Sequence, residues 1–220
     1  MTAVVLLPGL GADRRLFDSV RLAGQELVIP QWPVPDEGDS VGTFAARLTG
    51  AVPKAEAVFL GGASFGGMVA LELAALVRPR GVFLIGSCSG PDAVTRLARP
   101  LAALASLVPE SVLGPRPWAM RRAASVFGRL SHEQRELFVS MACGTRASFI
   151  RWGVGAILSW RPSAQAAPVH HIHGSHDWLI PLARVHPDCV VQGGGHLLTL
   201  THPEQVGQFM SDVLRGDSPG

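Results

Sequence analysis

A chain of 220 residues that is 47% hydrophobic and 16% charged is long enough for one well-packed domain and too apolar to be disordered. Its net charge of +2 argues against a nucleic-acid-binding protein, and it has no uncharged apolar run of the roughly 18 residues that a membrane span needs. We therefore expect neither nucleic-acid nor membrane partners.

Six short apolar runs predict β-strands. Most are apolar at nearly every position, which is typical of strands buried on both faces of a parallel sheet. In chain order they are Ala3–Leu7, Glu26–Ile29, Ala57–Leu60, Gly81–Ile85, Val169–His173 and Cys189–Gln192.

Helical segments are predicted between these strands. Ser40 is a candidate N-cap for the first of them, and Gly216 a candidate C-terminal cap for the last. They cover residues 41–51, 65–77 and 203–215. This alternation predicts a three-layer α/β fold with about six mainly parallel strands.

The interval from Gly90 to Ala167 breaks the alternation and predicts only helices. Ser131 followed by Gln134 has the spacing of a capping box. The expected helices cover residues 92–108, 117–130, 131–144 and 148–160. We interpret this interval as a helical cap, which divides the chain into a first core part (1–90), the cap (91–164) and a second core part (165–220).

The cap is the basic part of the chain. Residues 91–164 carry ten arginines and four acidic residues, a net charge of +6, so the remainder carries a net −4. Two readings stay open: the arginines lie on solvated helix faces, or groups such as Arg121 and Arg122 attract a small-molecule substrate with negative charge.

The most informative segment is Gly62-Ala63-Ser64-Phe65-Gly66, which joins a predicted strand to a predicted helix. A serine at such a sharp turn needs a strained backbone, and bulky side chains two residues away would clash. The pattern G-x-S-x-G in this context predicts a nucleophile elbow. An ordinary glycine-rich turn is the alternative.

A serine nucleophile needs a base and a group that orients the base. His196 follows three glycines after the last predicted strand, and Asp177 follows the strand before it. Both positions lie beyond the C-terminal ends of their strands, where open α/β sheets place their sites. Asp92 is the alternative acid, whereas Asp188 precedes a strand and lies at the wrong end.

The order of these blocks along the chain resembles that of the α/β-hydrolase superfamily, in particular of small serine esterase-like members with a helical cap. The segment LLPGLGADRRLF is similar to the family's first core strand and oxyanion loop, and GASFGG to its elbow. HGSHDWLIP is similar to its acid loop, and GGGHLLTLTHPEQV to its histidine loop and last helix. The resemblance spans nearly the whole chain and implies a catalytic triad of Ser64, Asp177 and His196.

The resemblance also implies an oxyanion hole formed by the backbone N–H groups of Leu10 and Phe65. Two features depart from the family pattern. Pro8-Gly9 stands where many relatives have His-Gly, and the loop PQWPVPDEGDS replaces a glycine-rich loop. The family's usual antiparallel strand pair before the first core strand is not expected here.

Aromatic residues are the candidates for an apolar substrate pocket. We predict that three tryptophans bind substrate: Trp32 in the loop PQWPVPDEGDS, and Trp118 and Trp152 in the cap. The alternative is that these side chains pack the cap against the core.

The histidines at 170, 171, 173 and 176 with Asp177 could suggest a metal site, but no companion set of ligands appears elsewhere. We therefore expect no metal and no cofactor.

These features favour a serine hydrolase that cleaves a small carboxylic ester or thioester through an acyl-enzyme. Two alternatives stay open: a carbon–carbon bond hydrolase or lyase that uses the same triad, and a non-catalytic ligand-binding module. The three cysteines are far apart, and the N-terminus has no basic segment before its apolar run. A cytoplasmic location without a signal peptide is therefore expected.

Overall fold

The structure is a computed structural model that describes residues 2–94 and 116–216. Its centre is a six-stranded sheet in which every strand pair is parallel, with strand order β2-β1-β3-β4-β5-β6. The strands are β1 (Thr2–Leu7), β2 (Glu26–Val28), β3 (Ala57–Ala63), β4 (Gly81–Ile85), β5 (Val169–Gly174) and β6 (Cys189–Val191). The prediction of about six mainly parallel strands is confirmed.

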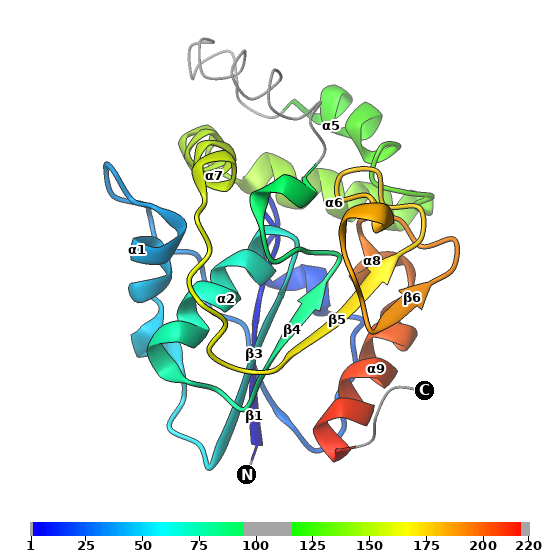
Figure 1. The fold of residues 1–220 in the computed structure, drawn as a ribbon. Helices are drawn as coiled ribbons and strands as arrows, with labels where there is room; N and C mark the ends of the chain where they lie inside the picture. The colour runs from blue at the N-terminus through cyan, green and yellow to red at the C-terminus, as the bar shows by residue number, and fades with distance from the viewer. Residues whose placement is uncertain (1, 95–115, 217–220) are drawn as a thin grey trace.

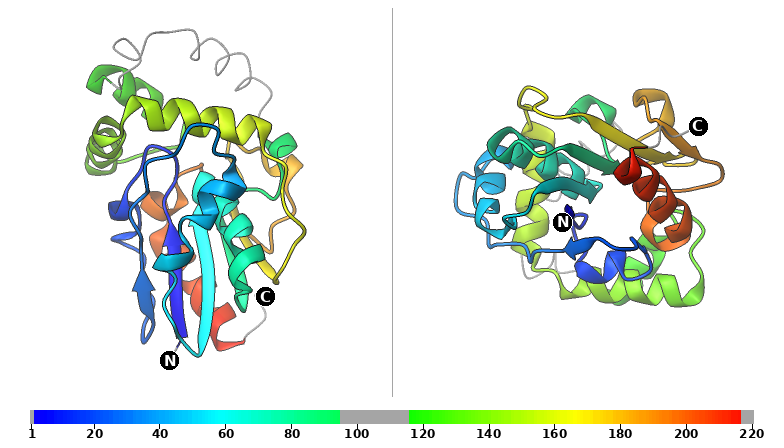
Figure 2. Two further views of the ribbon diagram at one scale, coloured as in Figure 1. Left: turned by 90° about the vertical axis from the view of Figure 1, so that its left-hand side faces the viewer. Right: turned by 90° about the horizontal axis from the view of Figure 1, so that it is seen from below.

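Helices cover both faces of the sheet, as Figures 1 and 2 show. Side chains alternate between the faces along each strand, so Val5 and Leu7 pack toward one helical layer and Val4 and Leu6 toward the other. The first layer contains α1 (Val41–Ala46) and α2 (Phe65–Val77), and the second contains α9 (Pro203–Arg215). The result is a three-layer α/β fold.

Three further helices lie across the C-terminal ends of the strands (Figure 1). They are α5 (Pro117–Ala124), α6 (His132–Gly144) and α7 (Ala147–Ser159). Ser131 and Gln134 form the predicted capping box at the start of α6. The helix expected at 92–108 lies almost entirely outside the described residues, which end at Val94 before this gap. Just before the gap the chain forms a 3₁₀ turn, Pro91–Ala93.

Several element bounds differ from the sequence-based expectation. The first helix ends at Ala46 instead of residue 51, and the chain continues as a 3₁₀ turn. The hydroxyl of Thr49 donates a hydrogen bond to the Ala46 carbonyl at this helix end. Helix α5 ends before the turn at Gly128, whose φ is +135°. The short α8 (Leu198–Thr201) was not expected, and the remaining 3₁₀ turns are Arg14–Phe17, Thr49–Ala51 and Leu182–Arg184.

None of the helices in the described part of the chain is long and apolar enough to cross a membrane.

Candidate active site

Ser64 lies at the tip of a strained turn between β3 and α2. Its φ of 52° and ψ of −120° are rare for a residue with a side chain. The flanking glycines make this turn sterically feasible. A Cβ at Gly62 would meet the carbonyl carbon of Gly66, and a Cβ at Gly66 would meet the carbonyl oxygens of Leu7 and Pro8.

The backbone of Ser64 is fixed by β4 and the loop that follows it. Its N–H donates to the Ile85 carbonyl at 3.1 Å, and its own carbonyl accepts the Ser87 hydroxyl at 2.7 Å. Ser87 therefore stabilises the turn that carries the serine. The side chain of Ser64 remains available at the end of the sheet.

His196 joins the serine to the acid. The turn after β6 brings its imidazole to the elbow, with Nε2 2.8 Å from the Ser64 Oγ. Its Nδ1 lies 2.7 Å from Oδ2 of Asp177, which follows β5. Three residues that are far apart in the sequence therefore form one hydrogen-bonded series, as predicted.

Asp177 is 4% exposed, and its second oxygen, Oδ1, accepts the Ile180 N–H at 2.9 Å. Burial acts to raise the pKa of this carboxyl, but His196, the Ile180 N–H and His173 together lower the pKa below its usual value. The carboxylate is therefore ionised at neutral pH and can only accept hydrogen bonds. It follows that His196 carries its proton on Nδ1 and presents Nε2 as an acceptor to the serine hydroxyl.

The two rival aspartates lie elsewhere. Asp92 is in the 3₁₀ turn after β4, where its carbonyl contacts Arg184. Asp188 lies at the opposite end of β5, where its carboxylate accepts the His171 N–H at 2.7 Å. Neither carboxylate is bonded to His196.

Two buried histidines on β5, His171 and His173, lie next to the acid loop. The Nε2 of His173 donates to the Ile180 carbonyl at 2.7 Å and lies 3.5 Å from Oδ2 of Asp177. Its Nδ1 is then the acceptor for Nε2–H of His171 at 3.1 Å. Burial lowers the pKa of His171 to about 4, so this pair is neutral at physiological pH. These histidines are hydrogen-bonded core residues in the structure.

An apolar cavity of about 330 Å³, which we call the serine cavity, opens beside Ser64 and His196. Its wall is formed by the loop after β1, by α5, α6 and α7, and by the acid and histidine loops. None of the described residues that line it is Asp, Glu, Lys or Arg. The side chains that define it include Leu10, Met68, Met120, Phe138, Met141 and Ile157.

The predicted oxyanion donors lie next to the serine. Phe65 is the first residue of α2, so its N–H has no acceptor within the helix and lies at the positive end of the helix dipole. Leu10 lines the serine cavity, and the preceding Gly9 approaches so closely that a Cβ there would lie 3.6 Å from the Ser64 Cβ.

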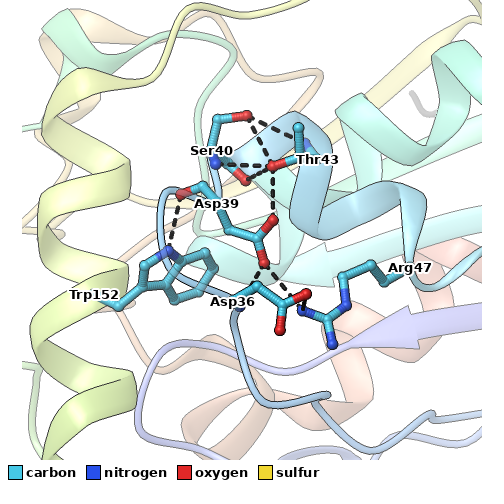
Figure 3. Close-up of polar contacts among 6 residues, drawn as sticks. All are labelled: Asp36, Asp39, Ser40, Thr43, Arg47 and Trp152. Atoms are coloured by element: carbon cyan, nitrogen blue, oxygen red, sulfur yellow. Dashed lines mark hydrogen bonds and ion pairs between the residues drawn. The ribbon is translucent and has the colours of Figure 1, made fainter.

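The three predicted substrate-binding tryptophans do not line the serine cavity. Trp118 is 63% exposed on α5. Trp152 extends from α7 to the loop before α1, where its indole N–H donates to the Asp39 carbonyl at 2.9 Å (Figure 3). Trp32 packs against Phe149 and lines a different cavity. Trp152 therefore attaches a cap helix to the core, which the sequence had offered as the alternative.

Among the described residues of the cap, no arginine lines this cavity. Arg121 forms a two-pronged ion pair with Glu136 on α6, with both N···O distances 2.8 Å. Neither Arg121 nor Arg122 lines the serine cavity.

One contribution to the site was not predicted from the sequence. The backbone N–H of His196 donates to the carbonyl of Phe127, in the turn between α5 and α6, at 2.9 Å. The rings of the two residues are 5.9 Å apart. Gly195 permits this approach, because a Cβ there would lie 2.6 Å from the Phe127 oxygen. Gly195 is therefore needed for the contact between the histidine loop and the turn after α5.

Comparisons with known proteins identify the family and the fold. A sequence model described as the alpha/beta hydrolase family matches residues 4–209 of the chain. No curated protein sequence matches it.

Solved structures share the fold at low sequence identity. An esterase from Thermogutta terrifontis is 20% identical, with a TM-score of 0.75, over 100% of this chain and 91% of the esterase. A bromoperoxidase from Bacillus anthracis is 17% identical, with a TM-score of 0.76, over 97% and 92% of the two chains. An enol-lactonase from Burkholderia xenovorans LB400 is 15% identical, with a TM-score of 0.75, over 97% and 92%.

Proposed function

The chain belongs to the alpha/beta hydrolase family, and from this membership we propose that it is a serine hydrolase that cleaves a small carboxylic ester or thioester through an acyl-enzyme. The observation that carries the proposal is the hydrogen-bonded series from the Ser64 hydroxyl through His196 to the Asp177 carboxylate. A serine hydroxyl that donates to an imidazole, which in turn donates to a buried carboxylate, is activated for attack on a carbonyl.

The proposed reaction has two steps. His196 Nε2 takes the proton of Ser64 as its oxygen attacks the carbonyl carbon, and the ionised Asp177 stabilises the imidazolium that forms. His196 then returns the proton to the leaving alcohol or thiol. In the second step His196 activates a water molecule, which hydrolyses the acyl-enzyme and restores the serine.

The backbone N–H groups of Phe65 and Leu10 are the proposed oxyanion donors. Each such donor typically contributes about 3 kcal/mol to the stabilisation of the tetrahedral intermediate. The placement of Phe65 at the first position of α2 supports this role, because the helix dipole favours negative charge at that point.

The serine cavity is the proposed site of the acyl group. Its volume of about 330 Å³ lies near the lower end of the roughly 300–1,000 Å³ of small-molecule pockets. Since its described wall carries no charged side chain of Asp, Glu, Lys or Arg, the acyl group is expected to be neutral and apolar.

A fluorophosphonate probe tests the proposal directly. We expect one probe molecule bound per chain, and peptide mapping should locate it on Ser64. The Ser64→Ala variant should carry no label. Protein that has not been labelled should release p-nitrophenol from p-nitrophenyl butyrate in an initial burst, as expected when the acyl-enzyme forms faster than it is hydrolysed. Absence of labelling near neutral pH supports a non-catalytic module instead. Turnover of ring-opened diketones without a trapped acyl-enzyme supports the carbon–carbon hydrolase.

The contact between the cap and His196 yields a second prediction. Gly195→Ala places a Cβ against the Phe127 oxygen and displaces the turn that accepts the His196 N–H. We expect kcat for p-nitrophenyl butyrate to fall by about tenfold or more, because small misplacements of a catalytic group are costly. KM should change little. Steady-state kinetics measure both constants.

Gly144→Ala is the matched control. Gly144 ends α6, and a Cβ at this position would have no heavy atom within 4 Å. An equal loss of kcat in both variants would contradict a specific role for the Phe127 contact.

A further inference from the structure

A second cavity, of about 590 Å³, lies on the other side of the loop that follows β1. We call it the arginine cavity. Its walls are the loop after β1, the proline-rich loop 30–35 and the turn between α6 and α7. Ala12 lines both this cavity and the serine cavity, so the two spaces adjoin at that residue.

The charged groups in its wall leave an excess of positive charge. Asp13 is neutralised by Arg15, whose guanidinium contacts both of its oxygens at 2.7–3.1 Å. The hydrogen bond from Arg15 lowers the pKa of Asp13, so the pair is fully formed at neutral pH. Arg14 and Arg146 also line the cavity, and within the described part of the chain their guanidinium groups have no hydrogen-bond or ion-pair partner. The cavity wall therefore has a net charge of about +2 at neutral pH.

The apolar part of this wall includes two aromatic side chains that pack against each other. The rings of Trp32 and Phe149 lie 6.0 Å apart, and both residues line the cavity. Trp32 also packs against Phe65, which follows the nucleophile, with ring centroids 5.7 Å apart. The indole N–H of Trp32 is shielded from solvent and lacks a hydrogen-bond partner among the described residues. Buried donors are normally satisfied, so this one points to a missing acceptor.

The start of α7 adds to the positive potential. This 13-residue helix begins beside the cavity, and no side chain caps its first N–H groups. The helix dipole therefore acts in the same direction as the two unpaired arginines.

We propose that the arginine cavity binds the leaving-group portion of the substrate, and that this portion combines a flat apolar group with a carboxylate or phosphate. The apolar acyl chain occupies the serine cavity, and the anionic end reaches Arg14 and Arg146 across Ala12. This inference rests on the proposed hydrolase activity and adds a substrate class to it. It also places the negative charge on the leaving group, away from the acyl cavity and from Arg121.

A matched pair of esters tests the proposal. The first is 4-(butyryloxy)benzoate, and the second is its neutral carboxamide. We expect Arg14→Gln and Arg146→Gln each to lower the anionic-to-neutral ratio of kcat/KM by about two- to fivefold, the upper part of the range for exposed charge pairs. The wild-type ratio should fall with added salt. A phosphate analogue, 4-(butyryloxy)phenyl phosphate, shows whether the site prefers one anion.

Arg161→Gln is the control, since Arg161 is an exposed residue that lines neither cavity. It changes the net charge equally and should leave the ratio unaltered. If the Arg14 and Arg146 variants alter the ratio no more than Arg161→Gln for either anion, the proposal is wrong.

A binding measurement separates this inference from the proposed activity. Calorimetry with Ser64→Ala protein reports the Kd of uncleaved 4-(butyryloxy)benzoate. The Arg14→Gln and Arg146→Gln changes should each weaken that Kd by about two- to fivefold in this background. If no ester is turned over but the Kd still depends on the two arginines, the anion site stands and the hydrolase assignment fails. A Kd that is insensitive to both changes overturns the site.

Discussion

Asp177→Asn is expected to lower kcat for ester hydrolysis by about four orders of magnitude. An asparagine can accept the Ile180 N–H through its carbonyl oxygen, as Oδ1 of Asp177 does. Its amide NH₂ then faces Nδ1 of His196, where the carboxylate of Asp177 accepts a hydrogen bond from Nδ1–H in the wild type. The imidazole is driven to the tautomer with its proton on Nε2, which cannot accept the Ser64 hydroxyl proton. Single-turnover kinetics with p-nitrophenyl butyrate measure the acylation rate directly.

Asp92→Asn provides the comparison, because the sequence alone left Asp92 as an alternative acid. This change should alter kcat by no more than about twofold, since surface substitutions away from key contacts usually have small effects. Circular dichroism should show both variants folded. A large loss in Asp92→Asn together with a small loss in Asp177→Asn would overturn the assignment of the acid.

Gly66→Ala is expected to destabilise the fold by more than about 4 kcal/mol, an effect reserved for severe steric conflicts and buried defects. Gly66 lies in α2, where alanine would normally be favoured over glycine by about 0.5–1 kcal/mol. The added methyl group would nevertheless meet the carbonyl oxygens of Leu7 and Pro8. These atoms belong to the backbone of β1 and of the loop that follows it, and β1 is paired with a strand on each side, so they have little freedom to move. Urea denaturation measures the loss, and poor soluble yield is expected.

Gly155→Ala tests the helix-propensity part of that argument. Gly155 is exposed on α7, and a Cβ there would have no heavy atom within 4 Å. The substitution should therefore stabilise the protein by about 0.5–1 kcal/mol. A similar loss of stability in both variants would show that the effect at Gly66 does not come from the elbow.

The parts of the site that the sequence predicted are those set by local chain geometry. Ser64 needs a sharp strand-to-helix turn, and the steric demands of that turn appear directly as Gly62 and Gly66. Asp177 and His196 follow consecutive strands of a parallel sheet, which brings both to the same edge. Continuous apolar runs likewise predicted the buried strands, without error for Gly81–Ile85 and with errors of at most three residues at the ends of the others.

The parts that were not predicted depend on contacts between distant segments. Trp152 is of a residue type that often lines substrate pockets. Its indole N–H instead donates a hydrogen bond to the carbonyl of Asp39, which is 113 positions away in the sequence. The contact of Phe127 with His196 uses a backbone carbonyl, which every residue has, so no residue type could indicate it. The distribution of cavities likewise depends on how the helices after β4 cross the sheet. Periodicity within one helix does not contain that information.

The hydrogen bond from His196 to the Phe127 carbonyl has a consequence for engineering this chain. A lid transplanted from a relative can enclose the same space and still remove the acceptor that holds the imidazole, unless its backbone supplies a carbonyl at the same point. Wholesale exchange of residues 91–164 is therefore a poor way to alter selectivity. Single replacements at Met120, Phe138 or Ile157 change the shape of the serine cavity and leave the Phe127 carbonyl in place.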